Sequence, residues 1–216
     1  ASDVYKRQAF LAGEEKNAAH IFGAHERTVN GVKGVLFTVW APKALSVSVV
    51  GEFNKYDGRV HLMEKIGDTG VFELFIPGLA AGCGYMYEIK RQGKGTTRKL
   101  DPVSRQISSV PITASVVSDE NMSDSYAWND GLWMIKRKKE AGKKKPVTVY
   151  EVSLTDWLKE KSADELVDFV KQEGYTHVCF LPVAEYLNEE MNGYSTLGYF
   201  AVTHLSLIHI SEPTRH

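Results

Sequence analysis

The segment from residue 147 to residue 183 decides the fold, because it places an amphipathic run between two apolar ones: VTVYEV (147–152), SADELVDFVKQEG (162–174) and YTHVCFLPV (175–183). The two outer runs are almost continuously apolar, which is typical of strands buried on both faces of a parallel sheet. In the middle run, Ser162 and Glu165 form a capping box and Gly174 provides a stop, so we expect a helix from Ala163 to Glu173. The sequence therefore predicts a β-α-β unit, the repeating element of a parallel sheet or barrel.

An all-β pattern precedes this unit. Short runs rich in β-branched and aromatic residues follow one another at spacings of roughly ten residues and are separated by Gly, Pro, Asn and Asp. These runs are GVLFTVWAP (34–42), SVSVVG (46–51), VFELFIPG (71–78) and YMYEI (85–89). The spacing is typical of antiparallel sandwiches, so we expect residues 18–118 to form an immunoglobulin-like β-sandwich.

The composition excludes several classes of protein. Of the 216 residues, 43% are hydrophobic and 25% charged, as in ordinary globular proteins. The net charge of -1 provides no overall attraction to nucleic acid or to an anionic membrane. No apolar run approaches the roughly 18 residues of a membrane span. Cys83 and Cys179 lie far apart in the sequence and are expected to be buried free thiols, which favours a reducing, cytoplasmic compartment over a disulfide framework or a metal site.

Residues 119–146 connect the two predicted domains and end in the basic run KRKKEAGKKKP (136–146). Basic runs can bind nucleic acid, but no aromatic residue is interleaved with this one, so we favour a solvated linker. Trp128 and Trp133 are expected to pin the linker to a neighbouring domain rather than to bind a ligand.

The two ends of the chain do not continue the patterns beside them. The first residues, ASDVYKRQ (1–8), and the last, HLSLIHISEPTRH (204–216), resemble in-frame translations of sequencing-adapter DNA. We therefore expect a tail at 1–17 whose first part is not native, and a non-native tail at 204–216. An authentic amphipathic tail containing Leu205, Leu207 and Ile210 is the alternative.

Candidate catalytic residues follow the two predicted strands, since the functional residues of parallel barrels lie at the carboxyl ends of strands. Glycoside chemistry requires two carboxyl groups, and Asp156 and Glu185 are the carboxylates that follow these strands most closely. Alternatively, both only hydrogen-bond to loops. His177 is expected to be a core histidine, and GKG (93–95) a turn rather than a phosphate loop.

The chain resembles the amino-terminal family 48 carbohydrate-binding module of glycogen branching enzymes in motifs that occur in the same order. These are HIFGAH (20–25), GVLFTVWAPKALSVSVVGEFNKYDGRVHLM (34–63), GVFELFIPGL (70–79), YMYEI (85–89) and KLDP (99–102). Three further motifs are similar to the first two strands and the next loop of the family 13 glycoside hydrolase barrel of these enzymes: YEVSLTDW (150–157), GYTHVCFLPVAEY (174–186) and GYSTLGYFA (193–201). The resemblance implies that residues 147–203 are the truncated start of a catalytic (β/α)8 TIM barrel.

The resemblance implies a cytoplasmic 1,4-α-glucan branching enzyme, which cuts an α-1,4-linked chain with retention and transfers it to a 6-hydroxyl without a cofactor or metal. It implies an α-glucan as partner, and neither nucleic acid nor membrane. The catalytic carboxylates of the family follow later strands, so the chain is expected to be an inactive fragment with no catalytic residue of its own. The alternatives are a glucan-binding module only, or a fragment of a debranching enzyme or of a malto-oligosyl trehalose trehalohydrolase.

Two aromatic residues are the candidate substrate-binding residues that the resemblance implies. Tyr194 matches the aromatic that stacks on the sugar beside the scissile bond. Tyr56 stands where the related modules commonly have a tryptophan that stacks on glucose, and a tyrosine ring can stack over a smaller area. Alternatively, Tyr56 only shapes its turn.

Overall fold

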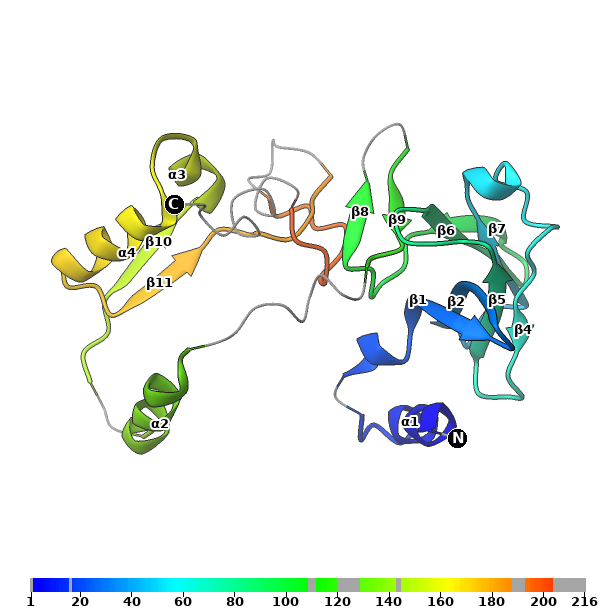
Figure 1. Cartoon of the computed structure of the whole chain (residues 1–216), viewed down its shortest axis with the longest axis horizontal. Helices are drawn as coiled ribbons and strands as arrows, with labels where there is room; N and C mark the ends of the chain where they lie inside the picture. Colours follow the sequence, from blue (N-terminus) through cyan, green and yellow to red (C-terminus); the bar gives the residue numbers. More distant parts are fainter. Residues whose placement is uncertain are drawn as a thin grey trace. The chain divides into compact units, whose positions relative to one another are not determined.

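The computed structural model describes residues 2–15, 17–108, 112–119, 129–142, 145–187 and 193–203. The chain divides into two compact units (Figure 1). One contains residues 1–120 and 184–203, and the other contains residues 121–183 and 204–216. Each unit is described by itself.

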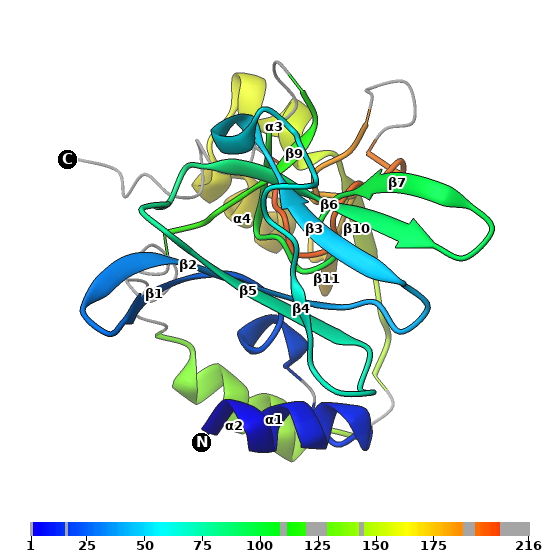
Figure 2. The same ribbon diagram turned by 90° about the vertical axis from the view of Figure 1, so that its right-hand side faces the viewer.

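The first unit contains the predicted β-sandwich, built from two antiparallel sheets (Figure 2). One sheet has the order β1-β2-β5-β4, with β1 Gly23–Val29, β2 Val32–Trp40, β5 Val71–Pro77 and β4 Glu64–Lys65. The other has the order β3-β6-β9-β8, with β7 also paired to β6; its bounds are β3 Ser46–Val50, β6 Gly84–Arg91, β7 Gly95–Lys99, β8 Gln106–Ser108 and β9 Ala114–Val116. The prediction of an all-β domain is confirmed.

The core of the sandwich forms because alternate residues of each strand point inward. On β2, Val35, Phe37 and Val39 are buried, and Phe37 packs edge to face on Tyr85 of β6 with ring centroids 5.0 Å apart. The full set of buried core residues is Val35, Phe37, Val39, Val47, Val49, Met63, Phe72, Ile76, Tyr85, Tyr87 and Val117. Thr38 and Ser48, which lie between the core residues of β2 and β3, are buried as well.

One carboxylate, Asp101, lies inside this sandwich with only 1% of its surface exposed. It accepts hydrogen bonds from the Tyr85 hydroxyl at 2.7 Å, the Tyr87 hydroxyl at 3.1 Å and the Val103 amide at 2.9 Å. Burial raises the pKa of Asp101 above its usual value, although these hydrogen bonds act in the opposite direction. The network satisfies both tyrosine hydroxyls, which would otherwise be costly to bury.

Helix α1 (Ser2–Leu11) occupies part of the segment that the sequence analysis set aside as a tail. Phe10 packs edge to face on Phe22 and on Trp40, with ring centroids 4.6 and 5.4 Å apart. Arg7 Nη1 donates to Glu73 Oε2 at 2.7 Å. This helix therefore contacts the sandwich through both an apolar and an ionic interaction. The second tail, at 204–216, lies outside the described residues.

The second unit contains the predicted β-α-β element. Strands β10 (Val149–Val152) and β11 (His177–Phe180) pair in parallel, with Val149 opposite His177. Helix α4 (Ala163–Gln172) begins at the expected capping box: Ser162 Oγ accepts from the Glu165 amide at 3.2 Å, and the Glu165 carboxylate accepts from the Ser162 amide at 2.7 Å. The prediction of a β-α-β unit is confirmed, and the helix ends one residue earlier than expected.

A second helix, α3 (Leu154–Glu160), was not expected from the sequence. Ser153 caps it by accepting a hydrogen bond from the Asp156 amide at 3.2 Å, and Asp156 lies in its first turn, where a carboxylate is favourable. Leu154 of α3 joins Leu166 and Val170 of α4 in a small core against Val152 of β10. The helix therefore fills the position just after the first strand.

The expectation that both strands are buried on both faces is wrong. Val149 is 53% and Phe180 is 48% exposed, whereas Val152 is buried by the helices. Cys179 and His177 on β11 are likewise exposed, and Cys83 is only partly buried, so the predictions of two buried thiols and of a core histidine are also wrong. In the described part of this unit the helices pack on the face of the strands that contains Val152. Strands are buried on both faces only when a second layer covers the opposite face.

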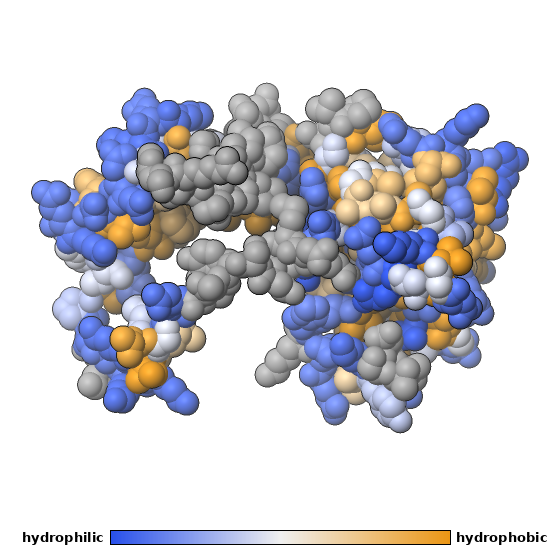
Figure 3. All heavy atoms as spheres, in the orientation of Figure 1, coloured by the Kyte–Doolittle hydropathy of each residue, from blue (hydrophilic) through white to orange (hydrophobic). Residues whose placement is uncertain are grey.

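The predicted linker contains helix α2 (Gly131–Glu140), none of whose residues is buried. Trp133 is 57% exposed, and Arg137 of the same helix lies over its ring at 5.3 Å, so Trp133 is not pinned into a core as expected. Figure 3 shows the apolar residues of this helix at the surface. Trp128 lies outside the described residues. Among the helices that the structure describes, none is both long and apolar enough to cross a membrane.

Candidate functional site

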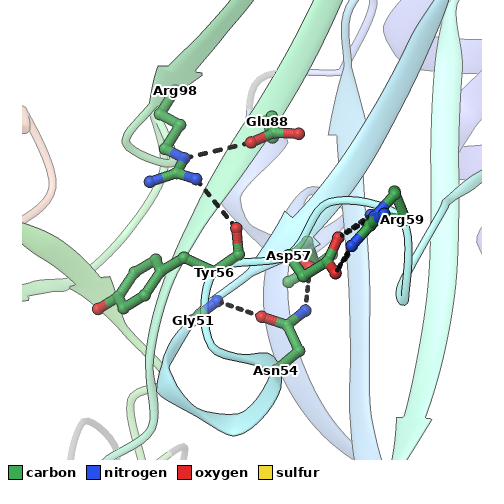
Figure 4. Close-up of polar contacts among 8 residues, drawn as sticks. Gly51, Asn54, Tyr56, Asp57, Arg59, Glu88 and Arg98 are labelled. Atoms are coloured by element: carbon green, nitrogen blue, oxygen red, sulfur yellow. Dashed lines mark hydrogen bonds and ion pairs between the residues drawn. The ribbon is translucent and has the colours of Figure 1, made fainter.

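The turn between β3 and β4 carries the candidate residue Tyr56, and buried Asn54 organises it (Figure 4). Asn54 Oδ1 accepts a hydrogen bond from the Gly51 amide at 3.0 Å, and Asn54 Nδ2 donates to the Val49 carbonyl at 2.9 Å. The same amide nitrogen lies 2.9 Å from His61 Nδ1. One side chain thus joins the start of the turn, the end of β3 and the returning chain.

Two glycines let this turn lie directly on β6. A Cβ atom at Gly51 would overlap the carbonyl oxygen of Gly84, and one at Gly58 would overlap the carboxylate of Glu88. Gly51 has an extended backbone, so close approach and not a left-handed conformation explains this glycine. The turn is therefore seated on the outer face of the sheet at two points.

The backbone at the tip of the turn is strained. Lys55 and Tyr56 have φ angles of 54° and 57°, a left-handed conformation that costs a residue with a Cβ roughly 1–2 kcal/mol. The Tyr56 amide donates to the Gly51 carbonyl at 2.9 Å, which closes the turn. The hydrogen bonds of the turn therefore offset the backbone strain. In this conformation the Tyr56 side chain points away from the loop (Figure 4).

Arg98 and Glu88 lie beside Tyr56 on neighbouring strands. They are directly opposite each other in the antiparallel pair of β6 and β7, and Arg98 Nε donates to Glu88 Oε2 at 3.2 Å. Arg98 Nη2 donates to the Tyr56 carbonyl at 2.9 Å, and the guanidinium carbon lies 5.6 Å from the centre of the Tyr56 ring. Sequence reasoning did not single out either residue; the signal that could have found them is the β6–β7 register across the GKG turn.

An ion pair within the turn completes the surroundings of Tyr56. Arg59 donates to both carboxylate oxygens of Asp57, from Nε at 2.9 Å and from Nη2 at 2.7 Å. The hydrogen bond from the Arg59 side chain is the main reason that the pKa of Asp57 is lowered to about 2. Asp57 is therefore ionised at neutral pH.

The other candidate residue, Tyr194, lies in the later segment of the first unit, of which the structure describes residues 184–187 and 193–203. Isolated β-bridges join Ala184 to Val202 and Tyr186 to Thr196. By its contacts this segment belongs with the sandwich, where Gly198 packs so closely on Ile107 that a Cβ atom would come within 2.7 Å of its Cδ1. Tyr194 itself is 63% exposed, so its ring is available to a ligand.

The two candidate carboxylates differ in their surroundings. Asp156 is exposed in the first turn of α3, where the hydrogen bond from Lys159 Nζ at 2.7 Å is the largest cause of its lowered pKa. Glu185 is buried in the unit of the sandwich, its amide donating to the Ala201 carbonyl at 2.8 Å. Asp156 and Glu185 belong to different units of the chain. Their role as a catalytic pair stays a hypothesis.

Other chemistry has less support in the described residues. No group of three or more His, Cys, Asp or Glu residues is placed there to hold a metal ion. The GKG segment joins β6 to β7, with φ angles of 69° at Gly93 and 65° at Gly95, so the prediction of a turn is confirmed. The arrangement around Tyr56 is suited to binding, because it offers a partly exposed aromatic ring among fixed polar groups.

Comparison with known proteins shows which family the β-sandwich resembles. Residues 21–104 match the family model described as carbohydrate-binding module 48 (isoamylase N-terminal domain). The matched segment includes the whole Tyr56 turn together with Glu88 and Arg98.

Curated relatives resemble almost the entire chain. The chain is 42% identical over 204 residues to the 1,4-alpha-glucan branching enzyme GlgB of Methylococcus capsulatus, covering 90% of this chain and 27% of that protein. It is 45% identical over 215 residues to the GlgB of Thiobacillus denitrificans, covering 94% of this chain and 28% of that protein. The chain thus spans little more than a quarter of the length of these relatives.

Among solved structures, pullulanase from Bacillus acidopullulyticus has a similar fold, with a TM-score of 0.57 and 22% sequence identity. The match covers 85% of this chain and 25% of that one. The order of a β-sandwich followed by a β-α-β unit therefore also occurs in a solved structure.

Proposed function

We propose, because the chain is homologous to the amino-terminal region of 1,4-alpha-glucan branching enzymes, that its β-sandwich binds α-glucan chains for an enzyme that forms branches. The observation that carries this proposal is the Tyr56 turn, which lies inside the segment matched to carbohydrate-binding module 48. Its aromatic ring is partly exposed at the tip of a turn held by buried Asn54.

The chemistry of the turn suits a glucan. One face of a glucose ring carries mostly C–H groups and stacks on an aromatic ring, while its hydroxyls require hydrogen-bonding partners. Tyr56 supplies the ring, and at an exposed stacking site the sugar hydroxyls can remain hydrogen-bonded to water. An exposed stacking site of this kind binds weakly and is suited to retaining a long polymer near an enzyme.

For the whole protein we propose the activity of the relatives. It would cut an α-1,4-linked chain with retention and transfer the cut piece to a 6-hydroxyl, in the cytoplasm, where free thiols such as Cys83 and Cys179 remain reduced. Tyr194 is proposed to stack on a sugar beside the bond that is cut, because its ring is exposed. The 216-residue chain by itself is proposed to bind glucan without transferring it.

Titration of the chain with maltoheptaose in a calorimeter tests the binding site. Tyr56→Ala is expected to weaken binding by roughly 2- to 10-fold, the range that corresponds to one aromatic stacking contact. Tyr56→Trp should bind at least as tightly as the parent chain. The matched control is Tyr5→Ala, which removes an exposed tyrosine from α1. Unchanged affinity of Tyr56→Ala would show that Tyr56 only shapes its turn.

The whole protein requires a separate assay. Branching lowers the iodine colour of amylose and releases few reducing ends. A marked rise in reducing ends would instead indicate hydrolysis, as in a debranching enzyme or a trehalose-releasing hydrolase, and would overturn the proposed activity. Transfer catalysed by the purified 216-residue chain would contradict its assignment as a binding fragment.

A further inference from the structure

Arg98 makes three different contacts near the proposed glucan site. Its Nε donates to Glu88 Oε2 at 3.2 Å, its Nη2 donates to the Tyr56 carbonyl at 2.9 Å, and its guanidinium carbon lies over the Tyr56 ring at 5.6 Å (Figure 4). A planar guanidinium can form these contacts at once because its N–H groups point in several fixed directions. Arg98 therefore joins β6, β7 and the tip of the turn.

Arg98 binds the Tyr56 carbonyl at a position where the backbone conformation is strained. Tyr56 has a φ angle of 57°, and for a residue with a Cβ atom this conformation persists only when the surroundings hold it. Asn54 holds the start of the turn through Gly51, whereas Arg98 holds the peptide that follows Tyr56. Arg98 is thus placed to keep the tip from relaxing.

The ring contact gives the two faces of Tyr56 different surroundings. A cation over an aromatic ring is attracted to it, more strongly where water is excluded. The guanidinium lies over one face of the ring, so a sugar that stacks on this ring has to use the opposite face.

Glu88 keeps the arginine in this position. The Glu88 side chain is only 23% exposed, and Gly58 of the turn leaves the space that its carboxylate occupies. The register places Glu88 directly across from Arg98, where opposite charges on neighbouring strands attract each other.

We propose that Arg98 is a positioning residue, which fixes the backbone and ring of Tyr56 so that the sugar stacks on the ring face opposite the guanidinium, with Glu88 holding Arg98 in place. This inference rests on the proposed glucan binding at Tyr56. It adds that the affinity of the site depends on a residue that acts through Tyr56 rather than through its own contact with sugar.

A double-mutant cycle on the full chain tests the inference, with maltoheptaose as the ligand and calorimetry as the measurement. Arg98→Ala is expected to weaken binding about two- to fivefold, the change that corresponds to one exposed cation–π contact. In the Tyr56→Ala background, Arg98→Ala should cause no further loss, because the residue through which it acts is gone. Arg27→Ala, which removes an exposed arginine from β1, is the matched control and should bind like the parent chain.

Conservative variants separate positioning from simple charge. Arg98→Lys retains the charge but has a single nitrogen for two acceptors on different elements, so it should recover less than half of the lost affinity. Glu88→Gln should fall between the parent chain and Arg98→Ala. The amide resonances of residues 55–57 should shift in Arg98→Ala without ligand, which reports directly on the conformation of the turn.

The outcomes are distinguishable. If Tyr56→Ala leaves the affinity unchanged, the proposed binding site itself fails. If Tyr56→Ala weakens binding but the two losses add fully, or Arg98→Lys restores full affinity, then Arg98 contacts the sugar as a charge and the positioning role is overturned. Unshifted amide resonances of the turn in Arg98→Ala would overturn it as well.

Discussion

Replacing Asn54 by alanine removes a side chain that cannot reach a sugar from inside the turn, yet we expect the change to reduce both stability and glucan binding. Asn54 is buried and satisfies two backbone groups, the Gly51 amide at 3.0 Å and the Val49 carbonyl at 2.9 Å. In Asn54→Ala both groups lose their partner. A buried polar group left without a hydrogen bond costs about 1–3 kcal/mol.

With two such groups, we expect the free energy of unfolding to fall by about 2–4 kcal/mol. The full sum of the two costs is not expected, because water can enter the opened turn and bind the exposed groups. This is a large fraction of the stability of a small domain. Binding should fall as well, since the turn that presents Tyr56 is no longer held at Gly51. Asn54→Asp should also destabilise the turn, because a carboxylate accepts from Gly51 but cannot donate to Val49.

Urea unfolding of the full chain provides the measurement, followed through amide resonances of β3 and β6 so that the sandwich is observed separately from the second unit. Glu52→Ala, an exposed change two residues away, is the control and should alter the free energy by less than about 0.5 kcal/mol. A loss below 1 kcal/mol in Asn54→Ala, roughly the cost of a single hydrogen bond, would refute the reasoning.

Three further predictions concern single residues. Burial raises the pKa of Asp101 above its usual 3.8, so its contribution to stability is fully present below the pKa of the unfolded chain and is lost as pH rises through the folded pKa. Asp101→Asn should therefore be less destabilising at pH 7 than at pH 4 in urea titrations; an equal effect at both would contradict the assignment. Gly58→Ala should push the Glu88 carboxylate away, weaken maltoheptaose binding a few-fold and cost less than about 1 kcal/mol of stability, because a flexible side chain can move. Unchanged binding would argue against a role for Glu88. Ser162→Ala should destabilise α4 by about 1 kcal/mol, measured by amide exchange within the helix, and unaltered exchange would show that the cap contributes little.

The local patterns of the sequence predicted strands β2, β3, β5 and β6 of the sandwich and the β-α-β unit. The capping box at Ser162 and the alternation along residues 34–40 both depend on contacts within a few residues or on one repeated period. Helix α3 was missed because the residues after the first predicted strand, Asp156 among them, were interpreted as a loop with candidate catalytic residues. The exposure of Cys179 and His177 was missed for a different reason: a strand sequence shows how apolar a segment is, but not how many layers cover it.

Some residues of the candidate site could be found from the sequence, and others only from the structure. Tyr56 and Tyr194 could be chosen because each lies in a short motif that resembles a known family, and a motif is a local property of the sequence. Arg98 and Glu88 could not, since they become neighbours of Tyr56 only when β6 pairs with β7 and the turn folds onto that pair. The sequence by itself determined the β-α-β unit, the main strands of the sandwich and the GKG turn, through hydrophobic period, capping residues and glycine positions. The tertiary structure alone decided which side chains surround Tyr56, because strand register and close packing join residues that are more than 30 positions apart in the chain.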